Sequence, residues 1–463
     1  MRFVSLVAFV ACTPNEADPA DTHTSGTPGT TVFTPPVESS SVGAVVTCEV
    51  TDNTIRVACT ATLDVAAPGT WTAERAGSTV LTLVSASSTD HAVTLYGLAP
   101  DTAYVWSFDA GAARATGNIT TGVLPSDLDA LSIEASGTAS AVEHVLISQQ
   151  CTGVSYLLVV NTLGEVVWYE SAGTGGGGGG VTGYTWTEDN TFLWSYGQTD
   201  IIEMEPGGLR LWEASGFDRP LHHDLNKGSG RVYALNAEEH DGVVVDGLYV
   251  LEGGAVVAEW DLYDHVTIVG TGQSDPFWQS WFPGAEDWSH ANSVWSDGTT
   301  AVVSLRWQDA VLEISADPLA PDFGTILSTL TGTEDSDLTS EYTWVGGGDF
   351  DGQHHVTPTA DGYLLFDNRG LGEFSRALNV TVDRTADTVA EGESWSVLMH
   401  CDIQGAAYPL EGGNVLVTCA TESRVQEFES GNSIALWDLT ASCGPAGGPG
   451  GGAFTARGVP VTF

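Results

Sequence analysis

The stretches Gly164-Glu-Val-Val-Trp168 and Gly208-Leu-Arg-Leu-Trp212 share one phrase: a turn residue, then alternating apolar residues that end in a tryptophan or a large aliphatic. Such alternation after a turn is typical of a β-strand. The phrase recurs as Gly254-Ala-Val-Val-Ala-Glu-Trp260, Asp309-Ala-Val-Leu-Glu-Ile314, Gly392-Glu-Ser-Trp395 and Asn432-Ser-Ile-Ala-Leu-Trp437. The spacing is 44 residues from Trp168 to Trp212, 48 from there to Trp260, and 42 from Trp395 to Trp437, which suits one four-stranded blade. Six phrases predict a six-bladed β-propeller over residues 124–463.

The rest of the chain is also predicted to be all-β. Short runs dense in Val, Thr, Ile, Leu and aromatic residues alternate with Gly, Asp and Asn turns, and almost no ten-residue window keeps a helical period. Residues 42–122 are expected to carry some seven short strands, which form a small β-sandwich ahead of the propeller. Within it, Gly97-Leu-Ala-Pro-Asp-Thr-Ala-Tyr104 resembles the tyrosine corner of a fibronectin type III-like domain, in which the Tyr104 hydroxyl hydrogen-bonds to nearby backbone. The wide gap from Ile314 to Trp395 is expected to hold additional loop.

The N-terminus predicts export from the cytoplasm. Met1-Arg2 precedes the apolar run 3–10 and then Ala11-Cys12, which is the pattern of a lipoprotein-type signal over residues 1–12 with Cys12 as the lipidated residue. The alternative is ordinary secretion with removal of Cys12. Residues 13–41 are rich in Thr, Pro and Ser and predict a disordered tether. We expect an extracytoplasmic protein, periplasmic or secreted, that contacts the bacterial outer membrane or cell surface only through a lipid anchor.

Seven cysteines fit an oxidising compartment. Without Cys12 six remain, and they allow fifteen pairings. We favour Cys48 with Cys59 across a hairpin, Cys401 with Cys419 on neighbouring strands, and Cys151 with Cys443 between the ends of the large domain. No Cys-x-x-Cys spacing occurs, which argues against a thiolate zinc site or a redox dithiol.

The charge balance excludes some partners. The chain has 14 Lys and Arg against 60 Asp and Glu, for a formal net charge of -46, and Lys227 is its only lysine. Such an acidic protein repels nucleic acid and anionic lipid headgroups, so neither is expected to bind. In this setting a basic side chain at a pocket indicates function.

Three segments concentrate imidazole and guanidinium groups: Asp287-Trp-Ser-His-Ala-Asn-Ser293, Ser304-Leu-Arg-Trp-Gln-Asp-Ala-Val311 and Gly352-Gln-His-His-Val356. With His222 and His223 they predict an anion-handling site. Their pattern and order resemble the bacterial arylsulfate sulfotransferase family, which moves a sulfuryl group between phenols without a nucleotide sulfate donor. The resemblance spans roughly residues 125–440.

The resemblance implies roles for individual residues. His354 would be the histidine that becomes sulfated, and Arg306, His290 and His222 would complete the catalytic set. Substrate-binding roles would fall to Asn292, His223, His355 and Trp307. The substrates would be a small aryl sulfate and a phenol, with no cofactor. The chain departs from the family at Trp307, where a histidine is frequent, and in lacking a lysine as a second cation.

Two other hypotheses use the same residues. His222, His223, His290, His354 and His355 with Asp224 could ligate zinc or copper, because neutral imidazole is a common ligand. However, no His-x-His or His-Glu-x-x-His spacing occurs and Arg306 would adjoin the cation, so we predict no metal site. The second alternative is a non-catalytic cell-surface propeller that binds a ligand. The physiological donor and acceptor, the choice between His222 and His223, and the oligomeric state stay open.

Overall fold

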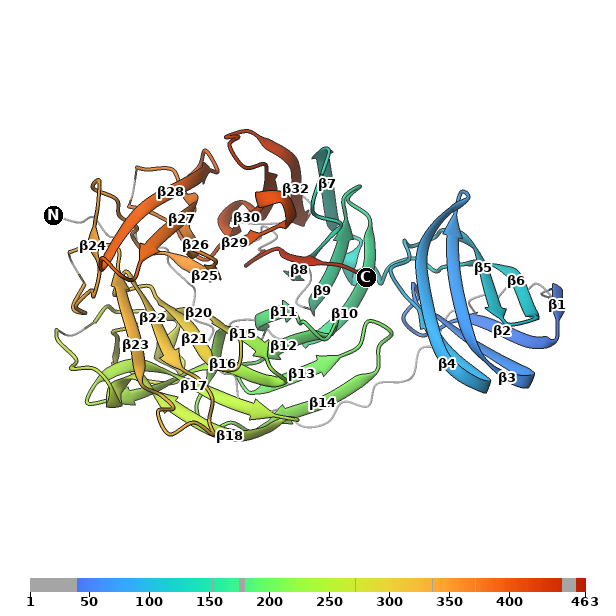
Figure 1. Ribbon diagram of the computed structural model, residues 1–463, viewed down its shortest axis with the longest axis horizontal. Coiled ribbons are helices and arrows are strands. Elements are labelled where there is room, and N and C mark those ends of the chain that lie inside the picture. The colour runs from blue at the N-terminus through green and yellow to red at the C-terminus, as the bar shows by residue number, and fades with distance from the viewer. Residues whose placement is uncertain are drawn as a thin grey trace, which may run out of the picture. The chain divides into compact units, whose positions relative to one another are not determined.

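The computed structural model describes residues 40–150, 154–174, 180–270, 272–334, 336–370, 372–443 and 455–463 (Figure 1). These residues form β-strands and five short 3₁₀ turns and contain no α-helix, which confirms the all-β prediction. The turns are η1 (Ser126–Leu128), η2 (Leu262–Asp264), η3 (Trp278–Ser280), η4 (Glu411–Gly413) and η5 (Ala420–Glu422). Within the described residues, no helix has the length and apolar character needed to cross a bilayer.

Six sheets make up the propeller and confirm the predicted number of blades. Blade 1 contains β33 (Val459–Val461), β8 (His144–Gln150), β9 (Val154–Asn161) and β10 (Val166–Thr174). Blade 2 contains β11 (Val181–Trp186), β12 (Phe192–Tyr196), β13 (Asp200–Met204) and β14 (Arg210–Ser215). Blade 3 contains β15 (Leu221–Gly228), β16 (Arg231–His240), β17 (Val243–Glu252) and β18 (Ala255–Asp261), with β19 (Glu286–Asp287) added beside β17.

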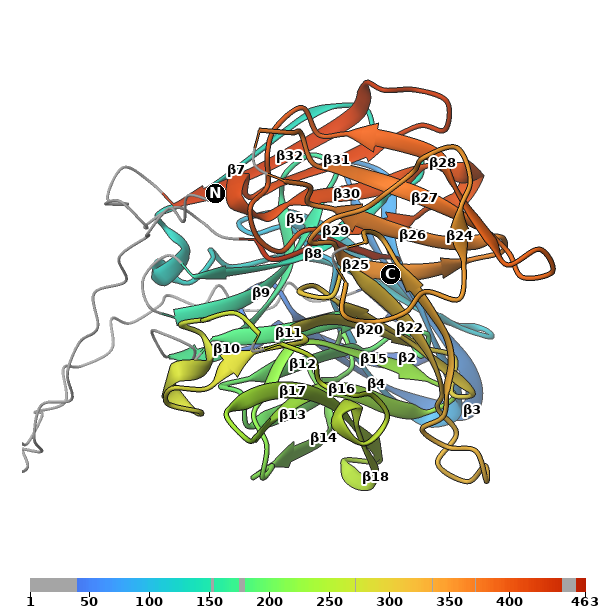
Figure 2. The same ribbon diagram turned by 90° about the vertical axis from the view of Figure 1, so that its left-hand side faces the viewer.

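The C-terminal half supplies the other three blades. Blade 4 contains β20 (Ala291–Ser296), β21 (Thr300–Leu305), β22 (Ala310–Ser315) and β23 (Ile326–Thr331). Blade 5 contains β25 (His354–Thr359), β26 (Gly362–Asp367), β27 (Arg376–Asp383) and β28 (Thr388–Ser396), with β24 (Thr343–Trp344) beside β28. Blade 6 contains β29 (Ala406–Pro409), β30 (Val415–Cys419), β31 (Arg424–Phe428), β32 (Ala435–Cys443) and β7 (Leu131–Gly137). Figure 2 shows blades 5 and 6 side by side, and β25 contacts β29.

The ring is closed at two places by strands far apart in sequence. The C-terminal β33 pairs with β8 as the innermost strand of blade 1, and β7 pairs with β32 at the outer edge of blade 6. Antiparallel pairing at both places gives each of these blades main-chain hydrogen bonds from the other end of the chain. Successive innermost strands contact one another in the order β33, β11, β15, β20, β25 and β29.

Indole groups explain the repeated sequence phrase. A tryptophan on the fourth strand from the axis donates a hydrogen bond to a backbone carbonyl in the next blade, at the turn before that blade's own fourth strand. The pairs are Trp168 to Pro206 (2.9 Å), Trp260 to Gly324 (2.8 Å), Trp395 to Glu429 (3.2 Å) and Trp437 to Thr162 (2.9 Å). In these four cases the phrase ending in Trp marks a junction between blades, where a buried aromatic body packs and its N–H finds an acceptor. Trp212 is the exception, since its indole donates to Glu203 (2.6 Å) within its own blade.

Blade 4 departs from the repeat. Its phrase, Asp309 to Ile314, lies mainly on the third strand β22, and the outermost strand β23 contains no tryptophan. The junction with blade 5 is instead made from the other side, because the Trp344 indole donates to the Thr331 carbonyl (2.9 Å). The wide gap before Trp395 thus contains β23, the predicted extra loop and three strands of blade 5.

Residues 40–120 form a separate set of six strands around their own apolar core. These are β1 (Ser40–Val42), β2 (Ala44–Val50), β3 (Val57–Arg75), β4 (Ser78–Leu95), β5 (Ala103–Ala110) and β6 (Ala113–Thr120), in the order β1-β6-β5-β3-β2 with β4 beside β3. The expected seven short strands are therefore six, of which β3 and β4 are long. The Tyr104 hydroxyl accepts a hydrogen bond from the Ala99 N–H (2.7 Å), as a tyrosine corner requires. The kinship with fibronectin type III domains stays a prediction.

Two of the predicted disulfides are present. Cys48 is bonded to Cys59 and Cys401 to Cys419. The third predicted pair, Cys151 with Cys443, includes a residue outside the described ranges. The signal, Cys12 and nearly all of the tether also lie outside them.

Trp437→Phe is predicted to destabilise ring closure. The substitution leaves the Thr162 carbonyl without its indole donor at a site where Trp437 is 1% exposed, so the free energy of unfolding should fall by about 1 to 3 kcal/mol. Urea unfolding followed by circular dichroism measures the change. Trp281→Phe makes the same chemical change where the side chain is 37% exposed, and it should have a much smaller effect. Equal losses in both variants would contradict the proposed junction.

Candidate functional site

The predicted site residues gather where the innermost strands begin. His222 and His223 open β15, His290 immediately precedes β20, and His354 and His355 open β25. Each blade starts on the axis with its innermost strand, so these starting points share one end of the channel. Three sequence segments from blades 3, 4 and 5 thereby meet at a single face.

The backbone at these strand starts is irregular. His223, His290 and His355 have φ of 50°, 47° and 48°, in the left-handed region that L-residues seldom occupy. The strand register shifts near all three, between Leu221 and Leu225, between Ala291 and Ser293 and between His354 and Val356, which is the signature of β-bulges. Bulges re-aim side chains, and backbone strain of this kind concentrates at functional sites.

His354 is held in one tautomer by its neighbours. Its Nδ1 lies 2.8 Å from Asn368 Oδ1, while the Asn368 amide donates to the carbonyls of Cys401 (2.7 Å) and Gln404 (2.9 Å). Because the Asn368 nitrogen is thereby identified as the donor, its oxygen must accept a proton from Nδ1. The unshared electron pair of His354 is therefore on Nε2, which accepts a long hydrogen bond from the Gln404 N–H (3.2 Å).

The surroundings keep His354 neutral. Burial lowers its pKa well below the ordinary value, and the positive charge of Arg306 lowers it further. Neutral imidazole with a fixed Nδ1–H presents Nε2 as a nucleophile or hydrogen-bond acceptor.

Arg306 has a guanidinium without a carboxylate partner. It lies in the turn between β21 and β22, donates from Nη2 to the Asp402 carbonyl (3.0 Å), and stacks over the Trp307 ring with Cζ 4.3 Å from the centroid. Its buried Nε has no hydrogen-bond partner, and among the described residues no carboxylate forms an ion pair with it. Burial lowers the pKa of Arg306, and the charges of Asp275 and Asp287 oppose this. A partly buried cation with free donors is suited to an anion.

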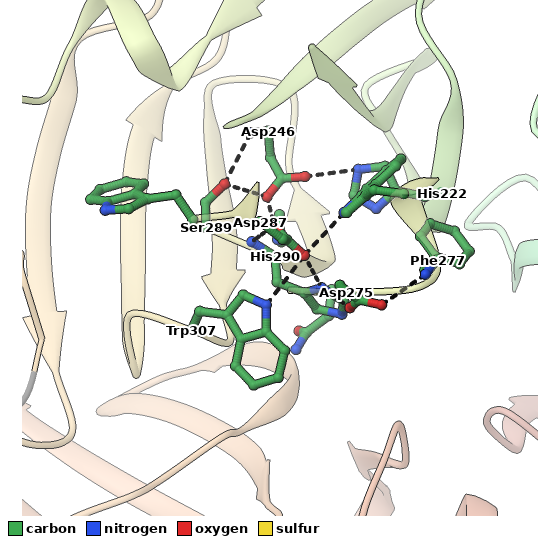
Figure 3. A network of polar contacts seen from close by, with 12 residues as sticks. His222, Asp246, Asp275, Phe277, Asp287, Ser289, His290 and Trp307 are labelled. Atoms are coloured by element: carbon green, nitrogen blue, oxygen red, sulfur yellow. Dashed lines mark hydrogen bonds and ion pairs between the residues drawn. The ribbon is translucent and has the colours of Figure 1, made fainter. Parts of the chain in front are cut away.

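Carboxylates support His290 (Figure 3). His290 Nδ1 lies 2.5 Å from Asp287 Oδ2 and 3.3 Å from Asp275 Oδ2. The same Asp287 oxygen also accepts the indole N–H groups of Trp278 (3.0 Å) and Trp307 (3.2 Å). Asp287 therefore fixes a proton on Nδ1 of His290 and holds the ring in one orientation.

A second carboxylate supports the paired histidines. Asp246 Oδ1 lies 3.0 Å from His222 Nε2, and His222 Nδ1 lies 2.9 Å from His223 Nδ1. The Asp246–His222 contact is close, although it is not aligned as a full hydrogen bond. Asp246 Oδ2 accepts from the Ser289 hydroxyl (2.5 Å). A proton on His222 Nε2 leaves its Nδ1 to accept from His223, which places the electron pair of His223 on Nε2.

The structure separates the roles of His222 and His223. His222 is 1% exposed and packs edge-on against Trp278. The His223 ring lies 4.8 Å from that of His290 and 5.5 Å from that of Phe277. Burial, followed by the neighbouring imidazoles of His290 and His222, lowers the pKa of His223 well below its usual range. His223 therefore adjoins the other imidazoles directly, and His222 stands behind it.

Asn292 connects the blades that carry the site. Its amide donates to the Gln353 carbonyl (2.7 Å), and Gln353 donates to the carbonyls of Leu305 (3.1 Å) and Ala310 (3.0 Å). Both side chains are buried, and the Asn292 oxygen has no hydrogen-bond partner. Asn292 thus fixes the backbone that precedes His354.

His355 faces different surroundings from His354. Its Nδ1 donates to the Ala407 carbonyl (3.0 Å), and its ring lies 4.1 Å from that of Tyr408. The nearest charge is Arg457, a buried residue that is ion-paired with Asp224 and donates to the His223 carbonyl (2.9 Å). The bulge at His355 therefore divides two consecutive histidines between two environments.

The carboxylate cluster beside His290 is an unfavourable metal site. Asp275, Asp287 and His290 bring ligand atoms within 4.8 Å of one another. However, three N–H groups already donate to Asp287 Oδ2, and a metal ion would displace the proton on His290 Nδ1. The cationic Arg306 nearby also disfavours a second cation. The geometry suits hydrogen-bonded carboxylates that support an imidazole.

Sequence reasoning missed several residues of the site. Asp246, Asn368 and Arg457 each hold a predicted residue in place, and Asp287 was noted only as the start of its motif. Asn368 belongs to Phe366-Asp-Asn-Arg-Gly370, at the end of the strand that pairs with the His354 strand. Asp246 lies within an apolar strand, and Arg457 lies next to a glycine-rich segment, so neither had a local signal.

Fold and site together define a six-bladed propeller with a histidine- and arginine-lined site on its axis. The model of the arylsulfotransferase (ASST) family matches residues 132–435, well over half of the chain, so the protein belongs to the arylsulfotransferase family. This membership supports an arylsulfotransferase-like function with small aryl sulfate and phenol substrates. No curated protein matches the chain.

Solved structures that resemble the chain are distant. A protein of unknown function from Bacteroides caccae is 11% identical with a TM-score of 0.45, over 70% of this chain and 100% of that chain. A catalytically inactive virginiamycin B lyase from Staphylococcus aureus, solved with quinupristin, is 11% identical with a TM-score of 0.37, over 66% and 87%. BamB from Moraxella catarrhalis is 11% identical with a TM-score of 0.34, over 66% and 87%.

The buried imidazoles predict a loss of stability in acid. Burial lowers the pKa of His355 to about 3, so between this value and the ordinary 6.5 the unfolded chain binds a proton that the folded chain does not. Stability is therefore full above pH 6.5 and falls as the pH decreases, by about 2 kcal/mol at pH 5 from this residue.

Urea unfolding at pH 8, 6.5 and 5 measures this effect. His355→Asn suits the left-handed backbone and should make the pH dependence shallower by that amount. His265→Asn alters an exposed histidine and should leave the dependence unchanged. An unchanged slope in His355→Asn would show that His355 binds its proton equally in both states.

Proposed function

We propose that the protein is an arylsulfate sulfotransferase that transfers a sulfuryl group from an aryl sulfate to a phenol through sulfated His354. The observation that carries the proposal is the fixed tautomer of His354, whose Nδ1–H is held by Asn368 and whose Nε2 lies in a site shared with Arg306. A nucleophilic imidazole beside a cation without a carboxylate partner is what transfer of an anionic group requires.

In the first step, the electron pair on His354 Nε2 forms a bond to sulfur while the bond from sulfur to the aryl oxygen breaks. Arg306 binds the sulfuryl oxygens with its free donors. The Gln404 N–H, displaced from Nε2 by the donor, becomes available to one of these oxygens. In the proposed mechanism His290 enters this step with a proton on Nε2, which passes to the departing phenolate while Nδ1 stays bonded to Asp287.

In the second step, an acceptor phenol takes the place of the first. Its proton returns to His290 Nε2, its oxygen attacks sulfur, and the bond between nitrogen and sulfur breaks to restore His354. His223 lies beside His290 and contributes a neutral Nε2 as an acceptor for the phenolic hydroxyl. His222 and Asn292 position the groups that act directly.

We also propose the domain order and location inferred from the sequence: a lipoprotein-type signal over 1–12, a tether over 13–41, a fibronectin type III-like domain over 42–122 and the propeller over 124–463. The Cys48–Cys59 and Cys401–Cys419 disulfides are consistent with an extracytoplasmic location. Lipidation at Cys12 would provide the membrane anchor.

His354→Asn is predicted to abolish transfer, because the variant lacks the nucleophilic nitrogen. With 4-nitrophenyl sulfate and excess phenol, nitrophenolate release should fall by at least about 10⁴-fold. Intact-mass analysis of the wild type with donor alone should show one sulfuryl adduct that maps to His354. The matched control His265→Asn changes an exposed histidine and should retain full activity. An adduct that forms on another residue, or a fully active His354→Asn variant, would contradict the mechanism.

Arg306→Gln is predicted to weaken transition-state binding of the sulfuryl group. Loss of this cation should lower kcat/KM about 10²- to 10³-fold, with the larger part in kcat. Steady-state kinetics with 4-nitrophenyl sulfate test this. Arg369→Gln is the control, since Arg369 is ion-paired with Glu373 and should have little effect. Equal kinetic losses in the two variants would remove Arg306 from the mechanism.

A further inference from the structure

A cavity of about 250 Å³ lies on the propeller axis, beyond the histidines as seen from the proposed sulfuryl-transfer site. Residues of all six innermost strands, or directly beside them, line it, and His355, Tyr408, Trp186 and Trp295 are among them. The catalytic residues named above, His354, Arg306 and His290, are not among its lining. The cavity is therefore separate from the proposed sulfuryl-transfer site, although His355 is the residue directly after His354.

The cavity has a buried end and an open end. His355 and Asp224, near the starts of β25 and β15, are buried, as is Arg457 just before β33. Trp186 and Trp295, at the ends of β11 and β20, are partly exposed. Because the innermost strands all start on the histidine side, the open end faces the opposite side of the propeller.

The buried end presents a hydrogen-bond acceptor. His355 is 7% exposed, and its Nδ1–H is used by the Ala407 carbonyl, so the electron pair is on Nε2. No hydrogen bond reaches Nε2 from the described residues. The pKa of His355, lowered to about 3, keeps the ring neutral and this nitrogen an acceptor.

The same end offers no uncompensated positive charge. Arg457 is paired with Asp224 and also donates to the His223 carbonyl. Asp224 in turn accepts the N–H groups of Leu225 (2.9 Å) and Val294 (3.0 Å). An anion entering here would lose its hydration and gain no free cation, whereas an uncharged hydroxyl can donate to His355 Nε2.

The walls combine aromatic, apolar and polar residues. Trp186, Trp295 and Tyr408 line the cavity together with valine, leucine and proline residues, and Thr185, Asn226 and Thr357 add polar groups. Aromatic walls with a few directional polar groups, of which His355 Nε2 is the acceptor at the buried end, are typical of small-molecule sites. The volume admits one small aromatic ring with its substituents.

We infer that this axial cavity is a second binding site, which holds an uncharged phenol with its hydroxyl donating to His355 Nε2 and excludes the aryl sulfate anion. The choice of a phenol rests on the proposed function, whereas the preference for an uncharged donor rests on the cavity itself. The site would then hold an acceptor or product phenol away from the sulfuryl group.

The test uses the full mature chain carrying His354→Asn, so that no transfer occurs, with 4-fluorophenol and 4-fluorophenyl sulfate as probes in fluorine NMR titrations. The phenol should bind in this background, and adding Arg306→Gln should leave its Kd unchanged within about twofold. Adding His355→Asn, which removes the acceptor but suits the backbone, should raise Kd about tenfold. Thr357→Phe, which fills the cavity without altering His355, should abolish the phenol binding that Arg306→Gln leaves unchanged.

Each alternative result overturns the inference. The inference is refuted if no phenol binds, or if phenol binding survives both His355→Asn and Thr357→Phe. It is also refuted if the sulfate ester binds and this binding is lost in Thr357→Phe but retained in Arg306→Gln. Turnover of aryl sulfate by the wild type decides the proposed function separately. A wild type without transferase activity whose His354→Asn form still binds phenol in the cavity would leave this inference standing alone.

Discussion

The indole-to-carbonyl hydrogen bond between neighbouring blades is the contact on which the rest of the structure depends. Trp168, Trp260, Trp395 and Trp437 each join the fourth strand of one blade to the next blade, and Trp344 serves the junction of blades 4 and 5. These bonds, together with the pairing of β7 with β32 and of β33 with β8, fix the rotation of the blades at five of the six junctions. Since the site takes His223, Arg306 and His354 from three different blades, its geometry exists only while that rotation is fixed.

Acidic groups organise the site in an indirect way. The chain has a formal charge of -46, yet no described carboxylate pairs with Arg306, because Asp287 and Asp246 are directed at His290 and His222. Indole and hydroxyl donors satisfy these two carboxylates in turn. The buried carboxylates thus orient the imidazoles and leave the donors of the Arg306 guanidinium available to a ligand.

Sequence predicted those features that repeat or cluster locally. Six apolar phrases predicted the number of blades because five of them mark the fourth strand of a blade, but the phrase at Ile314 lies one strand earlier, where tertiary contacts replaced the local pattern. The motif histidines and Arg306 were identifiable because each belongs to a short segment. Asp246 and Arg457 were not, since their partners are distant in sequence and only closure of the ring brings them together. A left-handed φ at His355 likewise follows from the bulge, which composition does not reveal.

That bulge explains how identical neighbours acquire different chemistry. His354 and His355 are both buried and neutral, and both use Nδ1 as a donor, so their intrinsic basicity cannot distinguish them. The difference is the direction in which Nε2 points. The lone pair of His354 lies in the environment of Arg306, and the lone pair of His355 lies in an aromatic cavity whose only cation is already paired. An anion is stabilised at the first and an uncharged hydroxyl at the second, because free donors are present in one and an acceptor in the other. A single register shift in β25 therefore suffices to place two environments with different ligand preferences on opposite sides of the start of that strand.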